Sequence, residues 1–279
     1  MLHFLDTILH GRYKTLPKPR DGIMTFLQAC LLFVAAILGG TLNSVAGGGS
    51  FIGFPALIFT GVPPINANAT NTVALWPGSV ASMRAYRKEL AEQNRVMLLV
   101  LSITSLVGGV LGAILLLRTP QSTFTLLIPY LLLLATLLFT FSKPITGLLR
   151  KYIPRQEDIS WFALLVVAFF QIIIAIYGGY FGGGIGILML ATLGMMGMEN
   201  INEMNAVKTL LQASINGVAV ITFIIAGAVV WPQAILMIVG AIIGGYGGAY
   251  YARQIDQRWV RLFVILVGFS MTLYFFLRR

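Results

Sequence analysis

Long stretches without a charged residue are the feature that most constrains the fold of this chain. Residues 97–117, 124–141 and 161–177 contain no Asp, Glu, Lys or Arg. A helix rises 1.5 Å per residue, so about 20 apolar residues cross a hydrocarbon core about 30 Å thick. A helix also satisfies its own backbone hydrogen bonds, which lipid cannot do. These stretches therefore predict an all-α polytopic membrane protein.

Composition and charge distribution agree with this prediction. Of the 279 residues, 58% are hydrophobic and 10% are charged, whereas a soluble domain has about 45–50% apolar and about 25% charged residues. The net charge is +10, but the basic residues gather between and beside the apolar stretches. That placement is typical of charges that set topology and bind lipid headgroups. We expect contact with the lipid bilayer and no nucleic-acid partner.

Residue types and motifs argue against an enzyme. The single cysteine, Cys30, excludes an intrachain disulfide, and the two histidines, His3 and His10, precede the first apolar stretch. The chain contains no P-loop pattern for ATP, no H-E-x-x-H zinc motif and no G-x-S-x-G nucleophile motif. We therefore predict no catalytic residue, no metal and no cofactor apart from a coupling ion.

The apolar stretches divide the chain into two similar halves. A basic or interfacial segment, 1–22, precedes a first transmembrane repeat, 23–142, and a polar linker, 143–158, precedes a second repeat, 159–279. We expect about eight spans as two tandem four-span repeats, and in each repeat glycines break the first segment. The expected spans are 23–42, 66–84, 96–117 and 123–142, then 160–177, 202–226, 232–251 and 259–277, with short apolar pieces at 50–60 and 185–197.

Three landmarks recur in order at a separation of about 136 positions. They are Gly47-Gly48-Gly49 with Gly182-Gly183-Gly184, Ile65-Asn66 with Ile201-Asn202, and Gly108-Gly109-x-x-Gly112 with Gly244-Gly245-x-x-Gly248. Duplication with helices interrupted at corresponding places is typical of secondary transporters, and it points to a binding site between the repeats. The basic loop follows the second span in one half and the third in the other. This suggests halves of opposite direction without settling it.

The two glycine motifs carry a family resemblance. The segment Asn43 to Leu57, with its Gly47-Gly48-Gly49 triplet, and its continuation to Asn71 resemble the first repeat motif of the TauE/SafE family of sulfite exporters and toluene-sulfonate uptake permeases. Gly178–Gly186 and Asn205–Thr209 resemble its second repeat motif. The resemblance covers nearly everything after residue 22. It implies a multi-pass permease of the bacterial inner membrane for small, sulfur-containing or related organic anions, without specifying the anion.

The glycine triplets are candidate substrate-binding segments. Consecutive glycines expose backbone N–H groups, and helices that begin just after them, at Ser50 and Ile185, would direct their positive dipole ends at an anion. The alternative is that the triplets only allow close helix crossing. For the Gly108/Gly112 and Gly244/Gly248 pairs we favour helix packing. The substrate-binding candidates here are Gly47, Gly48, Gly49, Ser50, Gly182, Gly183 and Gly184.

Lys208 is the most informative single residue, because a charge inside an apolar stretch is costly and usually functional. We predict that it attracts the anionic substrate and that Glu203 or Glu199 carries a coupling proton. An ion pair with Glu203, or a side chain that extends to the membrane surface, is the alternative. The corresponding residue of the first half is Asn71. Asn216 and Ser79 occupy a second matched pair of positions and are further substrate-binding candidates.

These features predict a secondary transporter for small anions, with H⁺ or Na⁺ as the possible coupling ion. A passive anion channel and a membrane scaffold subunit without transport are the alternatives. A homo-oligomer is left open by the sequence.

Overall fold

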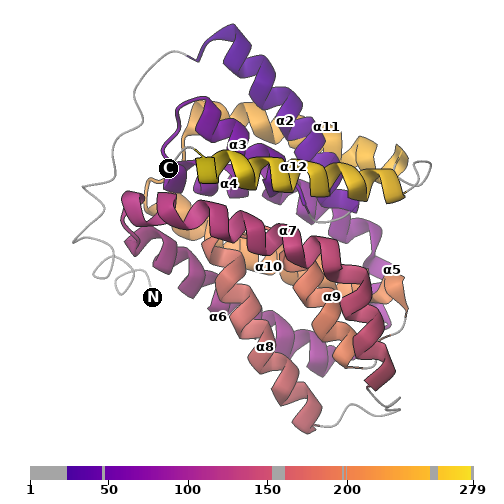
Figure 1. Cartoon of the computed structure of the whole chain (residues 1–279). Coiled ribbons are helices and arrows are strands. Elements are labelled where there is room, and N and C mark those ends of the chain that lie inside the picture. The colour runs from indigo at the N-terminus through magenta and orange to yellow at the C-terminus, as the bar shows by residue number, and fades with distance from the viewer. Residues whose placement is uncertain are drawn as a thin grey trace.

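The computed structural model describes residues 24–45, 48–152, 161–196, 198, 200–251 and 257–277. Every regular element within these residues is a helix, and the labels below follow Figure 1. The helices are α2 (Phe26–Val45), α3 (Ser50–Phe59), α4 (Pro64–Ala85), α5 (Arg87–Ala91), α6 (Arg95–Arg118), α7 (Gln121–Tyr152), α8 (Trp161–Tyr180), α9 (Ile185–Met195), α10 (Ile201–Ile225), α11 (Trp231–Tyr251) and α12 (Gln257–Leu277). The expected all-α class is confirmed.

The two predicted glycine breaks are present. The chain leaves α2 at Val45 and α8 at Tyr180, and it resumes as α3 at Ser50 and as α9 at Ile185. Gly182 and Gly184 have φ angles of 77° and 74°, in the left-handed region that side chains disfavour. A residue with a Cβ would resist this turn, so the glycines are needed for the break itself.

The segment expected as a polar linker starts as helix. α7 continues to Tyr152, and residues 153–160 lie outside the described part. Ile145, Leu148, Leu149 and Tyr152 recur at i, i+3, i+4 and i+7, the spacing of an amphipathic helix. The charged residues of this segment predicted a linker, but its apolar residues at helical spacing favour a continuation of α7. The N-terminal segment 1–22 also lies outside the described residues.

Four helices are long and apolar enough to cross a membrane: Phe26–Asn43, Arg95–Arg118, Gln121–Leu138 and Glu203–Ile225. Four shorter apolar helices accompany them: Ser50–Phe59, Leu164–Tyr180, Trp231–Gly247 and Leu262–Leu277. α4, the expected second span, belongs to neither group. Its N-terminal half buries Asn66, Asn68, Thr70 and Asn71, so other helices shield a polar helix at the centre of the bundle.

The helices pack mainly across the two halves of the sequence. α2 lies along α11, α6 lies along α8, and α4 contacts α10. In Figure 1, α7 and α12 lie side by side at the front of the bundle. Helices that are far apart in the sequence therefore form the most extensive interfaces.

The central pair, α4 and α10, is antiparallel. Near the start of α4, Asn66 Nδ2 donates to Ala228 O, which follows the end of α10, at 2.9 Å. Further along α4, Trp76 Nε1 donates to Ala213 O in the middle of α10 at 3.0 Å. α7 and α12 are antiparallel as well, because Tyr130 makes an edge-to-face contact with Phe276 while Gly268 packs on Thr136.

Glycines create the closest helix crossings, as the sequence analysis favoured. A Cβ on Gly108 would collide with Ala175 and with the carbonyl of Ile172 in α8. A Cβ on Gly244 would collide in the same way with the carbonyl of Ile37 in α2, and one on Gly112 with Ile176. The surroundings of Gly248 lie outside the described residues. These α6–α8 and α2–α11 contacts need glycine because backbone lies directly against backbone.

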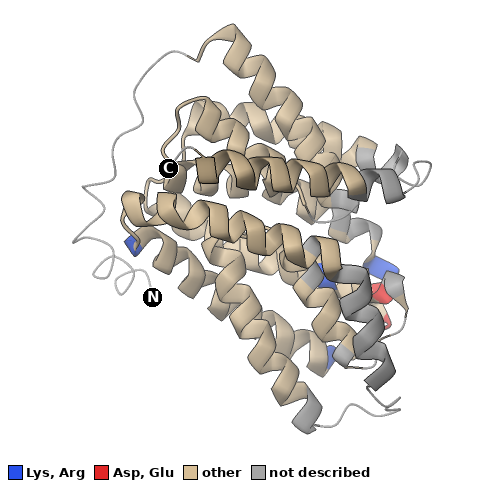
Figure 2. Cartoon of the chain, viewed as in Figure 1, with Lys and Arg blue, Asp and Glu red and all other residues tan. Residues whose placement is uncertain are grey.

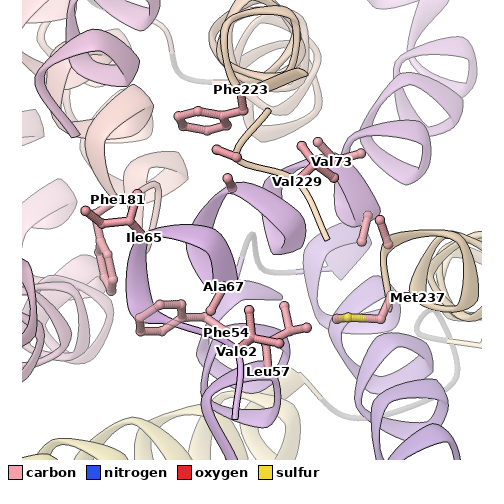
Figure 3. Packing of buried hydrophobic residues seen from close by; sticks show 14 of the residues in the cluster. Phe54, Leu57, Val62, Ile65, Ala67, Val73, Phe181, Phe223, Val229 and Met237 are labelled. Atoms are coloured by element: carbon pink, nitrogen blue, oxygen red, sulfur yellow. The ribbon is translucent and has the colours of Figure 1, made fainter. Parts of the chain in front are cut away.

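A buried aromatic cluster holds the first broken helix against the second break (Figure 3). Phe54 of α3 makes edge-to-face contacts with Phe181, at a ring-centroid distance of 5.6 Å, and with Phe124 of α7, at 6.4 Å. Such pairs add about 0.5–1.5 kcal/mol beyond the area they bury. The cluster therefore fixes the short helix α3 relative to the α8–α9 junction.

Most charged residues that the structure describes lie at or near helix ends (Figure 2). Arg87, Lys88 and Glu89 belong to the short helix α5, Glu92 follows it, and Arg95 and Arg118 begin and end α6. Glu203 lies in the first turn of α10. Lys208 is the exception, because its side chain is buried within the bundle.

Candidate functional site

Two matched polar faces meet at the centre of the bundle. On α10, Asn205, Lys208, Gln212 and Asn216 follow one another at i, i+3, i+7 and i+11, which places them on one side of the helix. The corresponding positions of α4 hold Asn68, Asn71, Leu75 and Ser79. Trp76 and Ala213, which touch each other, are separated by the same 137 positions. The two helices therefore cross at corresponding points and present corresponding faces.

Lys208 is only 7% exposed. Its Nζ donates to Asn205 Oδ1 at 3.0 Å, and no ion pair involves it among the described residues. Glu203, its expected alternative partner, instead accepts from Asn200 Nδ2 at 3.0 Å. The ammonium group has three donors, and the amide oxygen of Asn205 takes one of them. The structure thus shows neither an ion pair between Lys208 and Glu203 nor a Lys208 side chain that extends to the membrane surface.

The aliphatic part of Lys208 lies over the first turn of α9. A Cβ built on Gly186, the second residue of that helix, would lie 3.3 Å from Lys208 Cδ and 3.9 Å from Gln212 Oε1. Gly184 caps α9 without any side-chain hydrogen bond, so the first N–H groups have no side-chain acceptor. The buried Lys208 side chain thus packs on the positive end of a helix dipole, an arrangement that a bound anion would stabilise.

Asn43 joins this face to α4. Its Oδ1 accepts from Gln212 Nε2 at 3.3 Å, and its Nδ2 donates to Ser79 Oγ at 3.0 Å. Ser79 is a site residue predicted from the sequence, whereas Asn43, Gln212 and Asn205 were not predicted. The shared i, i+3, i+7 spacing on α10 could have identified Gln212 and Asn205. Asn43 comes from α2, and only the fold brings it to this position.

Asn71 and Asn68 connect α4 to the two breaks. Asn71 Nδ2 donates to Ser50 Oγ, the first residue of α3, at 3.2 Å. Asn68 Nδ2 donates to the carbonyl of Tyr180, the last residue of α8, at 3.1 Å. The predicted pair Ser50 and Asn71 is thus brought together, and α4 holds both broken segments.

The glycine triplets pack against different helices. Gly48 lies against Val264 of α12 and Gly49 against Gly39 of α2, whereas Gly183 and Gly184 lie against Ala135 of α7. Gly182 forms part of the left-handed turn. Asn216 is half-buried at the far end of the α10 face. Gly47 and Glu199 lie outside the described residues, and their roles stay predictions.

A cavity of about 860 Å³ lies elsewhere, between the α3–α4 turn, the start of α7 and the end of α12. Ile58, Val62, Pro63, Thr125, Leu126 and Phe275 are among its lining residues. None of the predicted site residues lines it. Its walls are mainly apolar, so its chemistry does not suit a small anion.

Comparison with known proteins places these features in a family. A sequence model of the family described as "Sulfite exporter TauE/SafE" matches residues 32–275. A probable membrane transporter protein of Haemophilus influenzae is 28% identical over 243 residues, covering 87% of this chain and 92% of that protein.

A second relative, the probable membrane transporter protein ORF9 of a Sinorhizobium species, is 28% identical over 250 residues and covers 90% of this chain and 93% of its own. The probable membrane transporter protein YfcA of Escherichia coli is 26% identical over 245 residues, which is 87% of each chain. No solved structure matches this chain.

Proposed function

Because this chain belongs to the sulfite exporter TauE/SafE family, we propose that it is a secondary transporter that moves small, sulfur-containing or related organic anions across the bacterial inner membrane. The family assignment and the apolar helices make it a multi-pass membrane transport protein. The substrate class, the secondary-transport mechanism and the membrane are our proposal.

One observation carries the proposal: the buried, cationic Lys208 side chain packs with its Cδ and Cε atoms on Gly186, in the first turn of α9. Both groups are electrically positive, and the hydrogen-bonding side chains next to them, Asn205 and Gln212, are neutral. Negative charge at this point would be attracted by both groups at once. Sulfite and sulfonate oxygens would accept hydrogen bonds from the ammonium and from backbone N–H groups.

Eight spans in two inverted repeats are part of the same proposal. The reciprocal pairs α2–α11 and α6–α8, and the matching glycine contacts of Gly108 and Gly244, support a two-fold relation between the halves. The antiparallel course of α4 against α10 supports opposite directions for the repeats. Inverted repeats with broken helices suit alternating access by movement of one repeat against the other around a central site.

The coupling ion has two candidate binding places in this proposal. If the coupling ion is H⁺, Glu203 and Glu199 near the start of α10 are the candidate carriers. If it is Na⁺, which we favour, the ion binds to α4 and neither carboxylate carries it. The protein could act as one chain or as a homo-oligomer, and the proposal does not depend on which.

The test is sulfite flux into proteoliposomes, measured with an entrapped sulfite-sensitive dye. Lys208→Met keeps the length of the side chain and removes its charge, while Lys208→Arg keeps the charge. We expect saturable uptake in the natural protein, near-complete loss in Lys208→Met and partial retention in Lys208→Arg. Lys88→Ala, which alters an exposed lysine of α5, is the matched control and should transport normally.

Three outcomes would overturn parts of the proposal. Undiminished flux in folded Lys208→Met would remove Lys208 from the pathway. Flux that rises linearly with sulfite concentration, without saturation, would indicate a passive channel. Absence of flux for sulfite, sulfonates and carboxylates alike, with a tightly co-purifying protein, would favour a scaffold subunit.

A further inference from the structure

Two side-chain oxygens on α4 are buried without a hydrogen-bond donor. Asn68 and Asn71 are each 1% exposed. Their Oδ1 atoms have no hydrogen-bond partner among the residues that the structure describes, although both amide nitrogens are bonded, to Tyr180 O and Ser50 Oγ. Buried amide oxygens are almost always satisfied. Two of them, one helical turn apart on the same face, point to a ligand that supplies positive charge.

The matching position of the other half shows what kind of group satisfies such oxygens. There, Asn205 corresponds to Asn68 and Lys208 to Asn71, and Asn205 Oδ1 accepts from the Lys208 ammonium at 3.0 Å. The second half thus carries a cation on its own side chain at the position where the first half has a second amide oxygen. A free cation at Asn68 and Asn71 would restore the same charge pattern.

We propose that Asn68 Oδ1 and Asn71 Oδ1 bind a Na⁺ ion beside the first break, in the position that Lys208 Nζ takes in the second half. Neutral amide and hydroxyl oxygens suit a hard monovalent cation, and the hydroxyl of Ser50, which is bonded to Asn71, supplies a third oxygen nearby. No group of three or more His, Cys, Asp or Glu side chains occurs among the described residues, so a divalent transition metal has no suitable ligand set.

The ion is expected to be small because the position is tight. Asn71 Oδ1 packs directly against Gly53 of α3, where any Cβ would collide with it. Lys208 packs in a similar way against Gly186 of α9. The C-terminal ends of broken helices and their unwound carbonyls hold Na⁺ in secondary transporters, and Tyr180, whose carbonyl accepts from Asn68, is such an end. Na⁺ is therefore favoured over the larger K⁺.

The inference rests on the proposed function only for the role of Na⁺ as coupling ion, because binding can be measured without transport. The experiment is thermal unfolding of the purified full chain in detergent, titrated with NaCl, KCl or choline chloride at constant ionic strength and without any sulfur anion. We expect a saturable rise in the melting temperature with NaCl alone, because a ligand that binds only the folded state stabilises it by mass action.

Two variants decide the site. Asn71→Lys places an ammonium group three residues after Asn68, which is the spacing of Lys208 from Asn205. We expect this variant to fold, because its own ammonium group takes the place of the Na⁺ ion. Its NaCl-specific rise in melting temperature should disappear. Asn66→Ala is the matched control: Asn66 is also a buried asparagine of α4, but its amide bonds Ala228 O and Gln121. This control should melt at a lower temperature and keep the full NaCl-specific shift.

Equal shifts with all three salts would overturn the proposal, and so would an unchanged NaCl shift in folded Asn71→Lys. If Asn71→Lys does not fold, Asn68→Ala replaces it with the same expectation. A clear Na⁺ shift in a protein without sulfite flux would reject the substrate proposal and keep the cation site. Sulfite flux without a Na⁺-specific rise in melting temperature would keep the substrate proposal and reject the cation site.

Discussion

α4 and α10 occupy corresponding places in the two halves, yet they differ in polarity and in charge. α10 qualifies as an apolar span and carries the buried Lys208. α4 does not qualify, carries no charge in its buried half and contains five buried polar residues, Asn66, Asn68, Thr70, Asn71 and Ser79. The two helices hold matched sequence positions and cross each other, but their buried side chains differ in chemistry. We infer from this difference that one helix attracts the anion and the other supplies neutral oxygens.

The strongest test of this comparison exchanges the two residues. Asn71→Lys combined with Lys208→Asn moves the only buried described lysine to the other half. We expect sulfite flux to fall by roughly 30-fold or more, since loss of a partner in a buried charged hydrogen bond costs about 2–5 kcal/mol. Initial uptake rates in proteoliposomes measure this. Flux near the natural level would mean that the two positions are interchangeable.

Stability tests whether the reciprocal glycine contacts are equivalent. Gly108→Val should place a side chain into the α8 backbone, and Gly244→Val into the α2 backbone, so each should lose about 1–3 kcal/mol of stability or more. Melting of the purified proteins in detergent gives the comparison.

Gly247→Val is the control for these two variants, because Gly247 is on the same helix as Gly244 and nothing lies within 4 Å of its Cβ position. A loss at only one of the two contacts would argue against a two-fold relation between the halves.

Alanine substitutions at Gly53 and Gly186, the glycines that contact Asn71 and Lys208, should distinguish an effect on helix packing from an effect on substrate binding. Gly53→Ala meets Asn71 Oδ1 directly, whereas Gly186→Ala meets the flexible Lys208 side chain at 3.3 Å. We expect Gly53→Ala to lower stability by about 1–3 kcal/mol. Gly186→Ala should stay folded and raise the apparent KM for sulfite by about threefold to tenfold, as the shifted ammonium loses part of its interaction. Equal stability losses would contradict this distinction.

The smallest expected effect concerns Glu203. Glu203→Gln keeps an oxygen that can accept from Asn200, and the carboxylate has no described contact with Lys208. We expect sulfite flux and its pH dependence to change by less than about twofold, within the range usual for exposed polar contacts. A large loss of flux, or a pH profile that becomes flat, would identify Glu203 as the proton carrier suggested by its sequence position.

Part of the candidate site was predictable from residue types and spacing. Lys208, Asn71 and Ser79 were found as polar residues at matched positions, and all three are buried in the structure. The helix starts at Ser50 and Ile185 followed from the glycine triplets. Asn43, Asn205 and Gln212 were not predicted as site residues, because their partners come from other helices or depend on which face is buried.

The amino-acid sequence by itself determined the membrane class, the recurrence of three motifs in order, the two breaks and the lysine within an apolar stretch. These properties depend on local composition and periodicity, which act over one or two helical turns. The tertiary structure alone decided that α4 and α10 are antiparallel, that Lys208 lies over the first turn of α9 and that Asn68 and Asn71 keep unpaired oxygens. The physical reason is that these features depend on packing between separate helices, some of them more than 100 residues apart, where the crossing angle selects which polar groups meet.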